Sequence, residues 1–202
     1  MFRVTHYIEQ SYDVGDDALS VFEKDGAIWF CVADGAGGTG LGRLASDYIV
    51  ADFNGSIDTK KSYDQYEFET YLKRLDLEIS RKNSGAESTA IMGCIRAGIV
   101  VGASVGDCEA WIFNNDYDYA LTQMQYLKPL LGSGEAQPIG FGPMLIEQSL
   151  LMGSDGLFKY ASFKAIREHV FAGVSAEGIA ALAKGEAGGL QDDIAVVLIS
   201  NS

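Results

Sequence analysis

Two runs of β-favouring residues near the start of the chain predict a hairpin. They lie at 18–22 and 27–33 and flank the Asp-Gly pair at 25–26, which is typical of a tight two-residue turn. If that pair forms the centre of the turn, opposed residues have numbers that sum to 51. The register then places Asp17 opposite Asp34.

The same register places Asp16 opposite Gly35, so carboxylates crowd the open end of the hairpin. Facing like charges are destabilising unless something positive compensates them, and a divalent cation would do so. Asp34 also opens a glycine-rich segment, 34–42. This segment fits either a carboxylate metal site or a phosphate-binding Gly-x-Gly-x-x-Gly loop formed by Gly35, Gly37 and Gly40.

Helical patterns follow the glycine-rich segment. Small and apolar residues at 41–53 indicate a helix packed closely on a sheet, and the strongest periodic pattern predicts a second helix at 62–83. Ser62 and Gln65 have the spacing of a capping box at its start. Its apolar stripe consists of Phe68, Leu72, Leu75 and Ile79, which we interpret as core residues.

The middle of the chain returns to β patterning. Short β runs at 89–95, 99–105, 110–113 and 117–121 are separated by turn residues and predict an antiparallel meander. The next segment, 123–144, contains all three prolines and shows no clean period, so it is expected to be a surface flap or lid.

The last third alternates strands and helices. A β run at 150–153 precedes helical patterns at 162–170 and 175–184, and 185–191 is expected to be a flexible link. The final run, 194–199, is apolar and β-branched, as in a strand buried on both faces.

Composition limits the class of protein. The 202 residues, 48% of them hydrophobic, suit one domain spanning 1–202. A formal charge of −13 argues against nucleic acid or an anionic membrane as the main partner. Cys31 and Cys94 lie in apolar runs and predict buried, reduced thiols. No targeting or membrane-spanning segment is recognised, so we expect a cytoplasmic protein.

Three aspartates stand at the ends of predicted strands. Asp34 and Asp155 each end an apolar run directly before glycine, and Asp192 directly precedes the last strand. Carboxylates that converge from distant parts of a chain are how hard cations are held. A dinucleotide loop fits less well, since Asp34 would repel a pyrophosphate and the polar segment 54–61 lacks the required second strand.

Six short motifs occur in order along almost the whole chain. They are Gly-Asp-Asp-Ala-Leu at 15–19, Val-Ala-Asp-Gly-Ala-Gly-Gly at 32–38, Ser-Thr-Ala at 88–90, Ser-Val-Gly-Asp-Cys-Glu-Ala at 104–110, Leu-Met-Gly-Ser-Asp-Gly-Leu at 151–157 and Asp-Asp-Ile-Ala-Val-Val at 192–197. This ordered set resembles the metal-dependent type 2C serine/threonine protein phosphatases, in compact bacterial form.

The resemblance implies an α+β fold, a four-layer α-β-β-α sandwich of two antiparallel sheets flanked by helices. It also implies two Mn2+ or Mg2+ ions, with Asp34 bridging both and Asp155 and Asp192 completing one shell. Asp16 and the Gly35 carbonyl would serve the other ion.

Two more acids receive roles from the resemblance. Asp17 would hold metal-bound water, and Asp107 with Asp155 could bind a third, weaker ion. The expected catalytic residues are therefore Asp34, Asp155, Asp192 and Asp17. The implied activity is hydrolysis of phosphoserine and phosphothreonine on a protein by a water bridging the two ions, with a Ser/Thr kinase as a further partner.

The sequence departs from the family pattern at substrate and strand positions. Tyr12 stands where many members carry an arginine that grips the substrate phosphate, and Asp193 replaces an asparagine. We expect Asp193 to be a solvated acid at a strand edge. Losing the arginine leaves a second hypothesis, a weakly active or non-catalytic binding module, unless Arg3, Arg43 or Lys159 replaces it.

Overall fold

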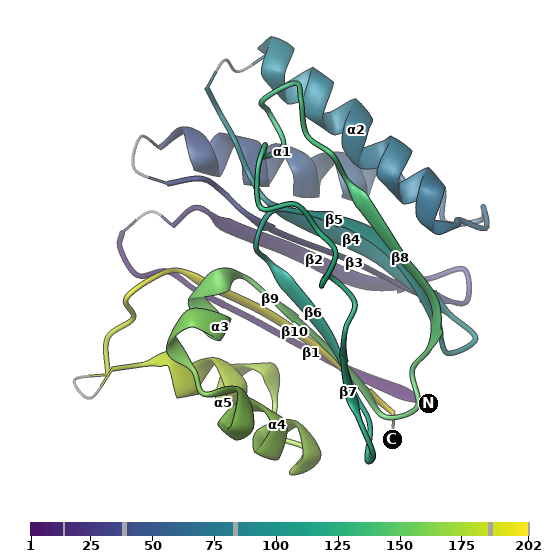
Figure 1. Ribbon diagram of the computed structural model, residues 1–202, viewed down its shortest axis with the longest axis vertical. Coiled ribbons are helices and arrows are strands. Elements are labelled where there is room, and N and C mark those ends of the chain that lie inside the picture. The colour runs from purple at the N-terminus through teal and green to yellow at the C-terminus, as the bar shows by residue number, and fades with distance from the viewer. Residues whose placement is uncertain (14, 38–39, 83–84, 186–187, 202) are drawn as a thin grey trace.

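The protein is seen in a computed structural model that describes residues 1–13, 15–37, 40–82, 85–185 and 188–201. Its described residues form two five-stranded antiparallel sheets that stack face to face, with helices on both outer surfaces (Figure 1). The α+β sandwich expected from the sequence is confirmed. No helix in these ranges is both long and apolar enough to cross a membrane.

The first sheet contains the predicted hairpin at one edge. Its strand order is β2 (Asp17–Lys24), β3 (Ala27–Asp34), β4 (Ala90–Arg96), β5 (Ile99–Val105) and β8 (Ile139–Leu145). Helices α1 (Leu41–Ser56) and α2 (Gln65–Lys82) cover its outer face (Figure 1).

The second sheet joins the two ends of the described chain. Its strand order is β1 (Phe2–Glu9), β10 (Ile194–Asn201), β9 (Ser149–Gly153), β6 (Glu109–Phe113) and β7 (Asp118–Ala120). Its outer face carries α3 (Asp155–Tyr160), α4 (Phe163–Phe171), α5 (Ala176–Ala180) and the 3-10 turn η1 (Ala181–Ala183).

Central strands of both sheets are buried on two faces. In β3, Phe30 and Val32 pack between the sheets, while Trp29 and Cys31 pack under the helices. Strand β10 alternates in the same way, as its uninterrupted apolar run predicts. Cys31 and Cys94 are buried free thiols, as expected. Hydrophobic packing on both faces therefore holds the ends of β3 and β10, next to Asp34 and Asp192, in place.

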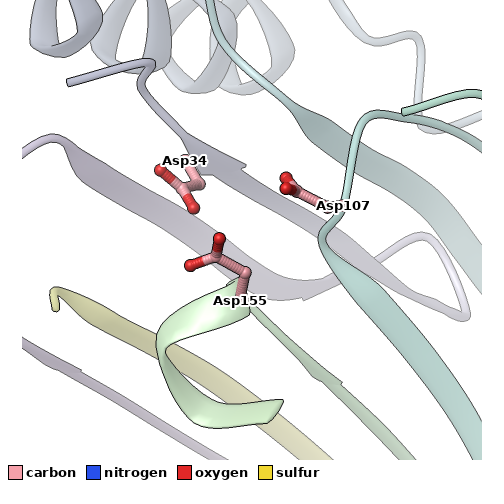
Figure 2. Close-up of side chains that lie close together, drawn as sticks. All are labelled: Asp34, Asp107 and Asp155. Atoms are coloured by element: carbon pink, nitrogen blue, oxygen red, sulfur yellow. The ribbon is translucent and has the colours of Figure 1, made fainter. Parts of the chain in front are cut away.

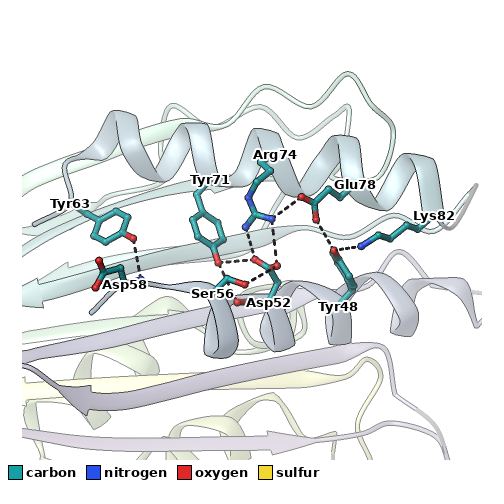
Figure 3. A network of polar contacts seen from close by, with 9 residues as sticks. All are labelled: Tyr48, Asp52, Ser56, Asp58, Tyr63, Tyr71, Arg74, Glu78 and Lys82. Carbon is teal, nitrogen blue, oxygen red and sulfur yellow. Dashed lines mark hydrogen bonds and ion pairs between the residues drawn. The ribbon is translucent and has the colours of Figure 1, made fainter. Parts of the chain in front are cut away.

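A polar network joins the two helices over the first sheet (Figure 3). Arg74 of α2 forms an ion pair with Asp52 of α1, and Tyr71 donates a hydrogen bond to the same carboxylate at 2.7 Å. Tyr48 of α1 donates to Glu78 at 2.6 Å. Burial raises the pKa of Tyr71 above its ordinary range, and its bond to Asp52 adds to the effect. These contacts fix α1, which begins beside the site.

The start of α2 differs from the prediction. The predicted capping box of Ser62 and Gln65 is wrong, because the reciprocal bonds form two residues away. The backbone N–H of Asp64 donates to Glu67, and the backbone N–H of Glu67 donates to Asp64, both at 2.9 Å. An aspartate therefore caps this helix where a serine was expected.

Three other predicted segments extend into ranges that the structure does not describe. The expected second helix ended at residue 83, the link spans 186–187, and the glycine-rich segment spans 38–39. The predictions for residues 38–39, 83 and 186–187 fall outside the described part of the chain.

The predicted meander is wrong in one respect. Strands β4 and β5 pair with each other in the first sheet, but β6 and β7 pair in the second. The chain crosses between sheets at 106–108, where Gly106 adopts a φ of 95°. Alternation within each strand is the same whichever sheet it joins, so the pattern could not show the crossing.

The segment 123–144 is not a free flap. It contains most of β8, and Leu130, Leu131 and Ala136 are buried. Asp76 of α2 holds the middle of the segment by accepting three hydrogen bonds from the backbone N–H groups of Gly132, Gly134 and Ala136. Prolines and glycines there shape a packed connection.

Candidate metal centre

Six aspartates line one cavity of about 320 Å³ at an edge of the sandwich. They come from five separate parts of the chain, and Gly35, Thr89 and Leu130 also line the cavity. The six acids are Asp16, Asp34, Asp107, Asp155, Asp192 and Asp193. Segments far apart in sequence therefore deliver a concentrated negative charge to one place.

Three of these side chains point toward a common space (Figure 2). Asp34 ends β3, Asp107 lies on the β5–β6 connection, and Asp155 is the first residue of α3. One carboxylate oxygen from each lies within 4.8 Å of the other two. Oxygen atoms at this separation can contact a single cation.

The hairpin register is confirmed. Asp17 is paired with Asp34 across β2 and β3, and the N–H of Gly35 donates to the carbonyl of Asp16 at 3.1 Å. Asp17 is only 1% exposed and lies outside the cavity lining. Its Oδ2 has no hydrogen-bond partner among the described residues, so it is a buried carboxylate oxygen in need of one.

The Ser-Thr pair before β4 holds the backbone of Asp34. The carbonyl oxygen of Asp34 accepts hydrogen bonds from the N–H of Thr89 at 2.8 Å and from Ser88 Oγ at 2.9 Å. The N–H of Asp34 donates to Thr89 Oγ1 at 3.2 Å. The sequence alone indicated no role for Ser88 and Thr89; the structure shows that they fix the strand end that carries Asp34.

Glycine is required where α1 begins beside the site. A Cβ at Gly35 would lie 2.3 Å from the backbone carbonyl of Gly42, and a Cβ at Gly42 would lie 2.6 Å from the carbonyl oxygen of Ala36. No side chain fits at such a separation. The glycines of this segment thus allow close backbone packing, and Gly35 lines the cavity beside the acids.

Burial and mutual repulsion make these acids hard to ionise. Burial raises the pKa of Asp34 to about 9, and the charges of Asp17 and Asp155 add to that effect. Burial likewise raises the pKa of Asp17 to about 7. The pKa values of Asp107 and Asp192 are also raised, first by burial and then by Asp155. A bound cation would offset this repulsion and favour the ionised form of the acids.

Among the described residues, Lys159 is the cation that forms an ion pair with this cluster. It forms an ion pair with Asp155, one turn earlier on α3. Arg43, in the first turn of α1, is near the site but donates to Asp47 and to the carbonyl of Gly15. Arg3 lies opposite Ser200 and lines a separate cavity, so it does not reach the acids.

Asp193 contradicts the expectation of a solvated acid. It is 9% exposed, and its carboxylate accepts hydrogen bonds from Ser11 and Asp16. The sequence could have indicated this burial, because Asp193 directly precedes a strand that is buried on both faces. Tyr12, next to Ser11, is 80% exposed. The position of the family's arginine therefore carries an outward, solvated side chain.

The donor set fits hard divalent cations. It consists of carboxylate and backbone carbonyl oxygens, with no sulfur or imidazole ligand among the described residues around the cavity. Of the six lining acids, only Asp155 belongs to an ion pair in the described part of the chain. The unpartnered oxygen of Asp17 and the raised pKa of Asp34 both indicate that positive charge is missing from the protein's own groups.

No model of a known family matches the sequence, and no curated protein matches it significantly. Solved structures do match. The serine/threonine phosphatase Stp1 from Staphylococcus aureus aligns with a TM-score of 0.82 and 18% identity over 100% of this chain and 96% of that one. The serine/threonine phosphatase from S. agalactiae gives 0.82 and 20% over 100% of both chains.

A third match carries metal. The catalytic domain of the protein phosphatase PstP, solved in complex with two manganese ions, aligns with a TM-score of 0.81 and 18% identity over 98% of this chain and 97% of that one. All three alignments span nearly the whole of both chains. The chain therefore has the fold of the bacterial type 2C serine/threonine phosphatases, as its ordered motifs led us to expect.

Proposed function

We propose that the protein is a metal-dependent phosphatase that hydrolyses phosphoserine and phosphothreonine on protein substrates, with residues 1–202 acting as one catalytic domain. The observation that carries this proposal is the convergence of six carboxylates on one cavity with a single ion-paired cation among the described residues. The fold supports it, because structures of the same fold are serine/threonine phosphatases.

We assign the acids to two Mn2+ or Mg2+ ions. Asp34, central in the cluster, would contact both ions. Asp155 and Asp192 would complete one set of ligands, since both line the cavity beside Asp34. Asp16 and the carbonyl of Gly35 would complete the other. The neighbour that holds two manganese ions supports this number.

Asp107 would share a third and weaker ion with Asp155. Their carboxylate oxygens lie within 4.8 Å of each other and of Asp34. Asp107 stands on the short connection between β5 and β6, whereas Asp34 ends β3.

When bound, such ions supply a water of lowered pKa and neutralise charge on the phosphoryl oxygens. The chain's own residues do the rest. Asp34 and Asp155 point their carboxylates toward a common space, where they would hold the ions. Asp17, buried beside Asp34, would accept a hydrogen bond from a water held there. No nucleophilic side chain is required.

The substrate is expected to be a phosphorylated protein, and a Ser/Thr kinase that modifies the same protein would be a functional partner. The exposed Tyr12 provides no charge for a phosphate. Lys159, half exposed, forms an ion pair with Asp155 and could contact a phosphate there. A non-catalytic binding module is not favoured, because an abandoned site would not be expected to keep so many mutually repelling acids.

The test is release of phosphate from phosphoserine and phosphothreonine peptides with Mn2+, with Mg2+ and with a chelator. Turnover should need metal and should be lost in Asp34→Asn. Asp116→Asn, which changes an exposed acid in the β6–β7 turn, is the matched control and should retain full activity. A wild-type protein that binds Mn2+ yet releases no phosphate from any peptide would refute the proposal.

A further inference from the structure

We propose that Asp193 is a positioning residue that holds the backbone of Asp16 against the start of β10 and so presets one half of the metal site. This inference rests on the proposed function, because it assumes that Asp16 serves a metal ion. It gives a task to an acid to which the family pattern assigns none, since an asparagine is expected there.

The carboxylate of Asp193 is fully used by the segment before β2. Its Oδ2 accepts a hydrogen bond from the backbone N–H of Asp16 at 2.6 Å. Its Oδ1 accepts from the backbone N–H of Ser11 at 2.7 Å and from Ser11 Oγ at 2.8 Å. Hydrogen bonds to a charged acceptor are the stronger kind. One side chain therefore joins residues 182 and 177 positions away in sequence.

An asparagine could not make the same contacts. Both oxygens of Asp193 accept from N–H donors on opposite sides, whereas an amide has one oxygen and an NH2 group that can only donate. Replacing the acid would set an NH2 group against the N–H of either Asp16 or Ser11. The hydrogen-bond pattern thus specifies a carboxylate at this position.

The backbone around Asp193 is built to admit this carboxylate. A Cβ on Gly15 would lie 2.6 Å from Asp193 Oδ2, so the residue before Asp16 must be glycine for the bond to form. Asp16 is also held from the other side, because its carbonyl accepts from the N–H of Gly35 at 3.1 Å and from Ser46 Oγ at 2.5 Å. Every backbone polar group of Asp16 is thereby fixed.

The position of Asp193 among other acids has an electrostatic cost, which its hydrogen bonds to Ser11 and Asp16 offset. Asp193 adds a buried negative charge beside Asp17 and Asp192, which is unfavourable in itself. It directly follows Asp192, whose carboxylate accepts the N–H of Asp193 at 3.0 Å. The hydrogen bonds of Asp193, here called the tie, therefore connect Asp192, assigned to one ion, with Asp16, assigned to the other.

The experiment compares Asp193→Asn with wild type in two measurements. Hydrogen exchange of the metal-free proteins reports the tie itself, and the amides of Ser11 and Asp16 should exchange faster in the variant. Calorimetric titration with Mn2+ reports its consequence. One of two binding events should weaken about tenfold or more, as for other residues that hold a metal ligand in place, while the second changes little.

Two further variants separate position from charge and from stability. Gly15→Ala keeps every charge but displaces Asp193 from Asp16, so it should also weaken one Mn2+ site. Asp76→Asn removes a carboxylate that likewise accepts three hydrogen bonds, but from Gly132, Gly134 and Ala136, away from the acids. It should lower stability and leave both Mn2+ affinities within about threefold of wild type.

The outcomes are distinct. Weakening of one site in both Asp193→Asn and Gly15→Ala supports the inference. Weakening in Asp193→Asn alone means that only its charge matters, and unchanged Mn2+ binding despite faster exchange means that the tie does not preset the site; either result overturns the inference. A wild-type protein that binds no Mn2+ would instead refute the proposed function, and the inference with it.

Discussion

Two buried carboxylates, Asp76 and Asp34, show how differently one residue type is used in this fold. Asp76 is 1% exposed and accepts hydrogen bonds from three backbone N–H groups, so its burial is compensated within the chain. Asp34 faces other acids across a cavity, and burial raises its pKa to about 9. A buried carboxylate with enough hydrogen-bond donors stabilises the fold. A group of buried carboxylates without such donors requires a bound cation.

Catalysis gives the largest expected contrast between the two acids. Asp34→Asn should lower kcat/KM for a phosphopeptide by about a thousandfold or more, because it removes the carboxylate assigned to both ions. Steady-state kinetics at saturating Mn2+ would measure this. A loss of less than about tenfold would mean that Asp34 is not central to the chemistry.

Stability should show the reverse contrast. Asp76→Asn should lower the free energy of unfolding by about 3 kcal/mol, since it disturbs a buried acceptor that serves several N–H groups. Urea unfolding of the metal-free proteins is the measurement, and Asp34→Asn should be neutral or stabilising in the same assay. If Asp76→Asn unfolds like wild type, the comparison between the two acids fails.

The pH dependence of stability distinguishes the two regions next. Asp34 has a pKa of about 9 in the folded protein, against about 4 for an ordinary aspartate. Between these values the folded state retains a proton that the unfolded state has lost, so the stability of the metal-free protein should fall as pH rises from about 5 to about 9.

Thermal unfolding at several pH values, with and without Asp34→Asn, would isolate this contribution. The decline should be shallower in the variant, and Mn2+ should restore wild-type stability at about pH 8. A decline of equal slope in both proteins would show that the acids of the cavity do not cause it.

The smallest effect concerns the cation that the cluster already holds. Lys159→Met removes the partner of Asp155, so Mn2+ should bind a few-fold more tightly, in keeping with about 0–1 kcal/mol for an exposed ion pair. Lys164→Met, which breaks the exposed pair with Glu168 on α4, is the matched control. Weaker Mn2+ binding in Lys159→Met would indicate that the lysine supports the site.

Local patterns in the sequence predicted much of the fold. The Asp-Gly turn fixed the pairing of β2 with β3, because a two-residue turn leaves one register. The apolar run at 194–199 predicted a strand buried on both faces, and β10 is such a strand. The sheet to which β6 belongs was not predictable, since strand alternation carries no information about which partner lies beside it.

The site was predictable to a similar extent. Strand-end acids indicated a cation site because they stand at the boundary between core and solvent. Asp193 was misjudged because its two partners, Ser11 and Asp16, lie in the segment before β2, which only the folded structure brings close. Asp76 was likewise invisible, since nothing in a helical pattern shows which loop it caps.

The hairpin that carries Asp17 and Asp34 has its turn at the far end of the molecule. The eight residues from Ala27 to Asp34 span about 26 Å, and pairing is continuous along them. A shift of the pairing by one position, set at the Asp25–Gly26 turn, would turn Asp17 away from Asp34. The arrangement of the acids in the cavity therefore depends partly on a surface turn at the other end of the hairpin, and sequence variation at this turn should be as constrained as variation at the cavity itself.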